Sequence, residues 1–266
     1  MRPFLNKKQL PPVLSSDDNH VLDNPHIFLD EIMRQAQDSE IIRLSMHIRE
    51  GRPLSTYIGE QEQVKILNKK DLNLSVCNWA DQILCATNEA RNALNNVVRK
   101  GKGYSLMPVP GDKIISLSNH WDFFTAEGTW PLTNGAIGTL SSFKLENKYP
   151  PRYIHEGKIE IMYSNISFEN ENFINVPIDF KCLMTGDPAL TPVEQYKIGK
   201  TGKYKFTIPY DFAFGYAITT WKAQGSSWPK VLLVEEKFPF EKELHKNFLY
   251  TAITRAEDKV VIVKKD

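Results

Sequence analysis

One short segment concentrates chemical groups that could bind phosphates. It reads GYAITTWKAQGSSW, covers residues 215–228 and stands directly before an apolar run. It combines hydroxyls, an ammonium group, a side-chain amide, a flexible glycine and an indole that could stack on a base. A surface loop that happens to contain these groups is an equally good interpretation. The candidate residues are Thr219, Trp221, Lys222, Gln224 and Gly225.

A second segment, LYTAITRA at residues 249–256, ends a stretch of helical character that begins near Glu241. Its arginine, Arg255, stands just before another apolar run. An arginine at a helix C-terminus is favoured by the helix macrodipole, and taken alone this plain structural role is the better interpretation. The side chain would reach the carboxyl edge of a sheet only if the helix geometry allowed it.

The composition is that of an ordinary globular protein, with 41% hydrophobic and 24% charged residues among 266. Because the net charge is only +1, contact with a polyanion would depend on local placement of cations. No run approaches the roughly 18 apolar residues of a membrane span, and the first residues turn charged too early for a signal peptide. We therefore expect a cytoplasmic protein. Cys77, Cys85 and Cys182 lack metal-binding spacing, so we expect no metal site.

The elements around the two segments predict a parallel sheet. Val231–Val234 and Val260–Val263 are continuous apolar runs, typical of strands covered on both faces, and the helix that ends at Arg255 lies between them. Residues 82–86 form another buried run, which a polar helical stretch at 88–100 follows. A strand, a helix and a parallel strand in succession indicate an α/β domain.

The pattern of predicted secondary structure changes between residues 106 and 205. Short β-rich runs at 113–117 and 158–162 are separated by turns, such as the one that Asn134 and Gly135 mark. The sequence therefore predicts an α/β domain interrupted by a small all-β insert.

Taken together, the two segments resemble motifs V and VI of superfamily-one helicases, in the form found in RecD/Dda-like enzymes, many of which phages encode. Further matches support this resemblance. QLPPV at 9–13 is similar to the end of motif III, and LDEIMRQ at 29–35 to motif IV. ILCATN at 83–88 resembles the strand and loop that touch the DNA backbone. GDKII at 111–115 and NGAIG at 134–138 resemble the family's SH3-like insert.

The resemblance implies a RecA-like parallel sheet domain, interrupted by a small SH3-like β-barrel insert and ending in a UvrD-like helicase C-terminal domain. Residues 1–22 would be the end of a first RecA-like domain. The second RecA-like domain would comprise 23–105 and 206–266, with the insert at 106–205. Such a protein would work in the cytoplasm of a bacterium or of a phage-infected host.

The resemblance also implies an ATP side. In this family ATP lies between two RecA-like domains, and the second supplies charges to the γ-phosphate. Arg255 would be the arginine finger, and Arg34 a second arginine at the γ-phosphate. Gln9 would report the state of the γ-phosphate to the DNA site, while Gln224 and Gly225 would line the nucleotide interface.

On the DNA side, Thr87, Asn88, Thr219 and Lys222 would contact phosphates of single-stranded DNA. Trp221 stands where the family usually has a histidine. A polar contact through an imidazole is therefore lost, although the indole could stack on the strand or brace it.

No G-x-x-x-x-G-K-[ST] pattern occurs in the sequence, and we assign no Asp-Glu pair to a Mg²⁺-binding motif. The resemblance implies that the phosphate loop and the Mg²⁺ ligands belong to a Walker-A-bearing N-terminal half, without which this chain would be inactive. One hypothesis is thus the C-terminal motor half of a DNA helicase. The alternative is a non-catalytic DNA-binding or regulatory remnant, which would need none of the γ-phosphate residues.

Overall fold

The computed structural model describes residues 39–60, 62–201 and 206–265. Their centre is a five-stranded sheet in which every strand pairing is parallel. In spatial order the strands are β1 (Val64–Leu67), β12 (Ala256–Val263), β11 (Trp228–Val234), β2 (Gln82–Cys85) and β10 (Ala217–Thr219). The predicted unit of strand, helix and parallel strand is confirmed, because α8 (Lys242–Ile253) connects β11 to β12.

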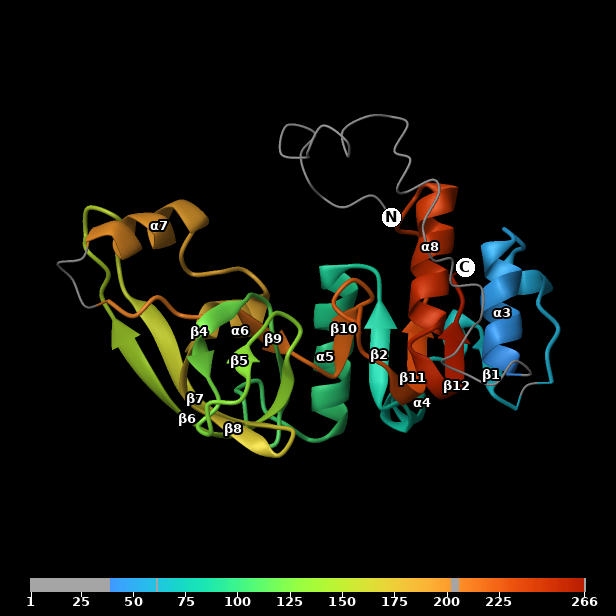
Figure 1. Cartoon of the computed structure of the whole chain (residues 1–266), viewed down its shortest axis with the longest axis horizontal. Helices are drawn as coiled ribbons and strands as arrows, with labels where there is room; N and C mark the ends of the chain where they lie inside the picture. The colour runs from blue at the N-terminus through green and yellow to red at the C-terminus, as the bar shows by residue number, and fades with distance from the viewer. Residues whose placement is uncertain (1–38, 61, 202–205, 266) are drawn as a thin grey trace, which may run out of the picture. The chain divides into compact units, whose positions relative to one another are not determined.

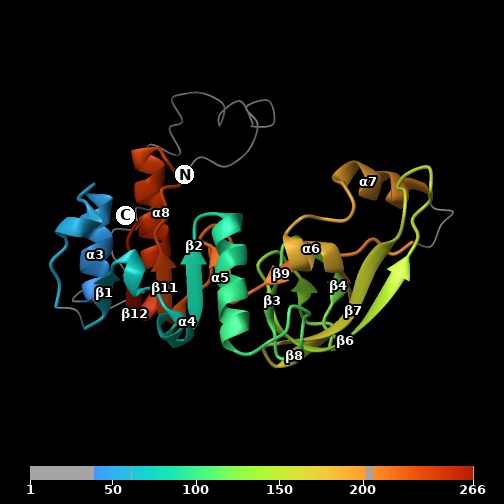
Figure 2. The same cartoon turned by 180° about the vertical axis from the view of Figure 1, so that it is seen from behind.

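Helices cover both faces of this sheet (Figure 1). On one face α8 and α3 (Glu40–Arg49) pack against Val231, Leu233 and Ile262. On the other face α4 (Leu74–Trp79) and α5 (Asn88–Gly101) pack against Leu232 and Val261. Figure 2 shows α5 and α4 from the opposite side. Successive side chains of a strand point to opposite faces, so each apolar run feeds two hydrophobic cores.

A second sheet interrupts the first in sequence. Its five strands are antiparallel, in the order β8 (Glu171–Asp179), β7 (Ile159–Phe168), β6 (Ile137–Lys148), β3 (Lys113–Ser116) and β9 (Phe212–Phe214). A bridge between Ile178 of β8 and Tyr210, just before β9, joins the first strand of this order to the last. The expected fold class is confirmed: an α/β protein with a parallel sheet and an antiparallel β insert.

The insert has smaller elements and a core of its own. Buried Ile114, Leu140 and Phe173 belong to this core. The turn predicted at Asn134 and Gly135 is present, with Gly135 at a φ of +91°. The smaller elements are β4 (His120–Phe124), β5 (Pro131–Leu132), α6 (Phe180–Thr185) and α7 (Pro192–Thr201). The division expected at 205/206 stays a prediction, and β9 of the antiparallel sheet follows it in the sequence.

Candidate functional site

The strand register sends the two sets of predicted residues to opposite edges of the parallel sheet. Thr219 ends β10 beside Cys85, the last residue of β2, at the carboxyl edge. Trp228 and Ala256 pair where β11 and β12 begin, at the amino edge. Because α8 runs back against the strands, Arg255 lies at the amino edge and does not reach the carboxyl edge. Thr219 and Arg255 therefore lie at opposite ends of the strands, whereas Lys222 and Gln224 are two residues apart in the segment that connects β10 to β11.

At the amino edge, Arg255 joins the two motif-bearing segments. Its Nε donates to the carbonyl of Thr251, and its Nη1 donates to the carbonyl of Ser226, each at 3.1 Å. The residue is 9% exposed. The first bond holds the arginine on the last turn of its helix, where the macrodipole favours a cation. The second bond ties it to the turn that contains Gln224 and Gly225.

That turn is shaped by a glycine. Gly225 has a φ of +92°, a conformation that costs other residues free energy, and a Cβ there would meet no atom within 4 Å. Gln224 and Gly225 are both exposed. The structure therefore brings Gln224, Gly225 and Arg255 together at one edge. Gln9 and Arg34, the other two predicted ATP-site residues, lie outside the described residues.

At the carboxyl edge, the loop after β2 is held by a carboxylate from the neighbouring strand. Glu236, two residues beyond β11, accepts hydrogen bonds from the amides of Ala86 and Thr87 and from the Thr87 hydroxyl. The same hydroxyl accepts a bond from the Ala90 amide and so caps α5. Asn88, the first residue of α5, is exposed. The groups of Thr87 that could hold a phosphate thus already bind an anion of the protein itself.

The chain connections run in opposite directions from β2 and β11: β2 is followed in this sheet by β10 on one side, and β11 by β12 on the other. The helix after β2, α5, covers one face, whereas the helix after β11, α8, covers the other. Open α/β sheets bind ligands at such switch points, outside the carboxyl ends of the strands. Here the carboxylate of Glu236, after β11, binds Thr87, after β2, at that switch point.

Two threonines at the end of β10 are buried. Thr219 is 6% exposed and therefore presents little surface to a phosphate. Thr220 is fully buried, and its amide and hydroxyl both donate to the carbonyl of Cys85. Asn95 of α5 holds the start of the same strand through bonds to the amide and the carbonyl of Ala217. The end of β10 is thus firmly positioned.

Lys222 and Trp221 follow β10 and contact different parts of the chain. The Lys222 ammonium donates to the Leu117 carbonyl at 2.9 Å and to the side chain of Asn134, both in the insert. Burial, assisted by the charge of Arg91, lowers the pKa of Lys222 from its ordinary value. Trp221 is 40% exposed and its ring packs near Phe248 of α8. Of the predicted DNA contacts, Asn88 and Trp221 are the exposed ones.

Sequence reasoning missed Glu236. Its one signal was its place: Glu235 and Glu236 directly follow the apolar run 231–234. Both carboxylates bind protein groups. Glu236 accepts from Ala86 and Thr87, as described above, and Glu235 accepts from His245 at 2.9 Å. Over the part of the chain that the structure describes, no group of three or more metal-binding side chains is present. In the same residues no helix is long and apolar enough to cross a membrane.

Residues 214–263 match the family model described as UvrD-like helicase C-terminal domain. This match includes both motif-bearing segments, although it covers only a minor part of the chain. An uncharacterized protein of Methanocaldococcus jannaschii is 25% identical over 162 residues, which are 58% of this chain and 11% of that protein. The chain therefore spans a small part of this relative.

Solved structures of Pif1 helicases are similar in fold. The Candida albicans Pif1 helicase is 13% identical with a TM-score of 0.45, over 89% of this chain and 55% of that chain. Bacteroides Pif1 bound to single-stranded DNA is 14% identical with a TM-score of 0.48, over 87% and 50%. Bacteroides Pif1 with ADP-AlF3 and single-stranded DNA is 14% identical with a TM-score of 0.45, over 90% and 52%. The chain spans about half the length of these proteins.

Proposed function

We propose that this chain is the C-terminal motor half of an ATP-dependent DNA helicase. Combined with a Walker-A-bearing half, it would couple ATP hydrolysis to translocation on single-stranded DNA and to duplex unwinding. One observation carries the proposal: the segment that matches the UvrD-like helicase C-terminal domain contains both motifs, and Arg255 of one bonds Ser226 of the other.

On the ATP side, Arg255 would stabilise the negative charge that develops on the transferred phosphoryl group. Gln224 and Gly225 would line the nucleotide beside it, with Arg34 and Gln9 completing the contacts to the γ-phosphate. By the family resemblance, the Mg²⁺ ligands would belong to the Walker-A-bearing half. This chain would thus contribute the positive charge of Arg255, at the amino edge of its sheet, to ATP hydrolysis.

On the DNA side, Thr87, Asn88, Thr219 and Lys222 would contact the backbone, and Trp221 would stack on a base. Lys222 and Thr87 would have to exchange a protein partner for a phosphate. We therefore expect the isolated chain to bind single-stranded DNA weakly and with strong dependence on salt.

A second candidate is a non-catalytic DNA-binding or regulatory remnant of such a helicase. The observation in its favour is that Arg255 already serves the fold through bonds to two carbonyls. ATP turnover separates the two functions, because a remnant would bind DNA without supporting hydrolysis.

The test is ATP turnover by the chain, by a Walker-A-bearing half, and by their mixture, each with and without single-stranded DNA. The proposal predicts DNA-stimulated turnover in the mixture alone. Turnover by this chain alone would contradict the assignment of the phosphate loop to another half. No stimulation in the mixture, with DNA binding retained, would support the remnant.

A further inference from the structure

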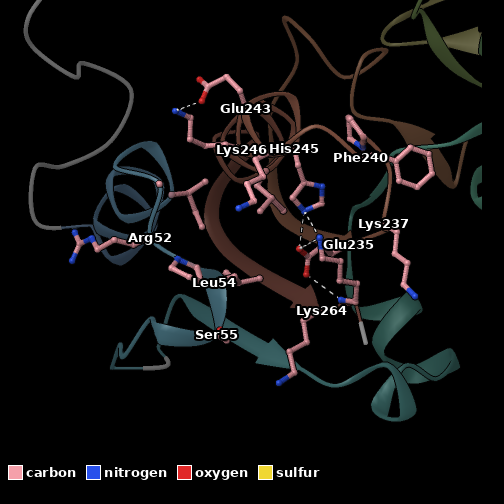
Figure 3. A pocket seen from close by; sticks show the side chains of 17 residues that line it. Arg52, Leu54, Ser55, Glu235, Lys237, Phe240, Glu243, His245, Lys246 and Lys264 are labelled. Carbon is pink, nitrogen blue, oxygen red and sulfur yellow. Dashed lines mark hydrogen bonds and ion pairs between the residues drawn. The ribbon is translucent and has the colours of Figure 1, made fainter.

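A cavity of about 540 Å³ opens between α3 and α8. Its walls are the end of α3, the segment after β11, the first turns of α8 and the residues after β12 (Figure 3). Since β11 and β12 end at the carboxyl edge of the sheet, the cavity lies at the same edge as Thr87. Its basic lining residues are Arg52, Lys237, Lys242, Lys246, Lys264 and Lys265.

Two carboxylates in the lining neutralise only part of this charge. Glu243 pairs with Lys246 at 2.8 Å. Glu235 accepts from His245, whose ring faces it in Figure 3, and lies 3.8 Å from the ammonium of Lys265. Arg52 forms an ion pair with Glu50, which is not a lining residue. The cavity keeps an excess of positive charge, on Lys237, Lys242 and Lys264.

Three of the lysines have no acidic partner in the part of the chain that the structure describes. Lys237, Lys242 and Lys264 make no ion pair within residues 39–60, 62–201 and 206–265. All three approach the cavity from segments at the carboxyl edge. Unpaired ammonium groups that line one cavity favour a ligand with more than one negative charge.

The backbone adds to the attraction for anions. The helix α8 starts at the cavity, and the residue before it, Glu241, makes no side-chain cap bond. The N-terminus of a helix carries partial positive charge and free amides, which suit a phosphate. In addition, the Nδ1 atom of His245 is buried and has no hydrogen-bond partner in the described part of the chain.

Exposed aromatic rings stand beside the cations. Phe240 lines the cavity and is 83% exposed, and Phe238 packs edge-on against it with ring centroids 5.9 Å apart. Cations that follow a backbone, together with rings on which bases stack, are the two components of surfaces that bind single strands. A compact anion such as free phosphate would use the cations and leave the rings in water.

We propose that the α3–α8 cavity binds single-stranded DNA and extends the DNA path from Thr87 across the ends of β11 and β12. Lys237, Lys242 and Lys264 bind successive phosphates, and Phe240 stacks on a base. The inference rests on the proposed function for the identity of the polyanion. Thr87 and the cavity lie next to each other along this edge, because β2 and β11 are neighbouring strands and Glu236, which follows β11, bonds Thr87.

The test compares two double variants at opposite ends of the same two strands. Lys237→Ala/Lys264→Ala removes charge just after β11 and β12. Lys230→Ala/Lys259→Ala removes equal charge from exposed positions toward the amino edge. Binding of a labelled oligo-dT by the full chain is followed by fluorescence anisotropy over a range of salt. We expect the first variant to bind about 10-fold more weakly, with a salt slope smaller by about 0.7 per lost contact. The second variant should match the wild type.

Two further arms identify the ligand. Phe240→Ala should lower affinity about 10-fold with an unchanged salt slope, since stacking involves no counterion release. Inorganic phosphate at the same phosphate concentration should displace little oligonucleotide. If inorganic phosphate displaces it fully, or if Phe240→Ala has no effect, the cavity binds single phosphates and the inference is overturned.

The remaining outcomes separate this inference from the proposed function. Should Lys222→Ala weaken binding while Lys237→Ala/Lys264→Ala does not, the inference fails and the proposed DNA contact stands. Loss in Lys237→Ala/Lys264→Ala without ATP turnover in the two-half mixture would support the inference and contradict the motor. A wild-type chain with no affinity for oligo-dT would overturn both.

Discussion

The carboxylate of Glu236 accepts hydrogen bonds from the amide and the hydroxyl of Thr87, at 3.0 and 2.6 Å. These two residues follow neighbouring parallel strands, so the contact closes the carboxyl edge of the sheet at its switch point. A phosphate that binds Thr87 would have to replace this carboxylate. The same contact therefore stabilises the loop in the free protein and opposes DNA.

Replacing Glu236 should consequently change stability and DNA affinity in opposite directions. Glu236→Ala leaves the amides of Ala86 and Thr87 without their acceptor, which should lower the free energy of unfolding by about 1–3 kcal/mol. It also frees Thr87 and removes a negative charge, so affinity for oligo-dT should rise several-fold. Urea unfolding and anisotropy measure the two effects. Weaker DNA binding by a folded Glu236→Ala protein would show that the carboxylate does not compete with DNA.

A buried ion pair connects α5 to the insert. Arg99 donates to both carboxylate oxygens of Asp112, at 2.9 and 3.0 Å, and also to the carbonyl of Met107. Their side chains are 4% and 0% exposed. Removing one partner leaves an uncompensated buried charge, so Arg99→Ala should lower the free energy of unfolding by about 3–5 kcal/mol. The exposed neighbour Lys100→Ala should stay within about 0.5 kcal/mol of the wild type. Equal urea midpoints for the two variants would contradict this role.

Lys113 should make a contribution to the stability of the fold that rises with pH. Burial lowers the pKa of this lysine from 10.5 to about 8, against the opposing charge of Asp81. Between these two values the unfolded chain holds the Lys113 proton more tightly than the folded protein. The contribution of Lys113 to the free energy of unfolding therefore increases with pH across this window. Burial raises the pKa of the Cys77, Cys85 and Cys182 thiols, whose contributions to the free energy of unfolding decrease with pH. From about pH 7.5 to about pH 9.5, urea unfolding should therefore give a more positive change in the wild type than in Lys113→Met, which keeps the cysteines. An equal change in both proteins would exclude a contribution from Lys113.

The sequence predicts much of the parallel sheet because its apolar runs are continuous. The runs at 231–234 and 260–263 lie within β11 and β12, and the helix between them is present with slightly shorter bounds than expected. Strand β10 has three residues. So short a strand has no periodicity of its own, and its place in the sheet comes from pairing with β2.

The contacts at the candidate site were harder to predict than the elements. The family resemblance implied that Gln224, Gly225 and Arg255 lie near one another, and their common edge follows from the parallel strands. By contrast, Lys222 bonds Asn134, which is 88 residues away in the sequence, and Glu236 bonds Thr87 across 149 residues. Pairings at such separations depend on tertiary packing, so residue type and local pattern do not reveal them.

The most direct test of the proposed motor function concerns the positive charge that Arg255 would bring to ATP. In the mixture with a Walker-A-bearing half, single-turnover ATP hydrolysis is measured for the wild type, Arg255→Ala and the exposed amino-edge control Lys230→Ala. Arg255 also bonds two carbonyls, so thermal unfolding is recorded for each protein. We predict that Arg255→Ala, still folded at the assay temperature, loses about a thousand-fold or more in rate, while Lys230→Ala keeps the wild-type rate. A rate for Arg255→Ala equal to that of Lys230→Ala would contradict the account.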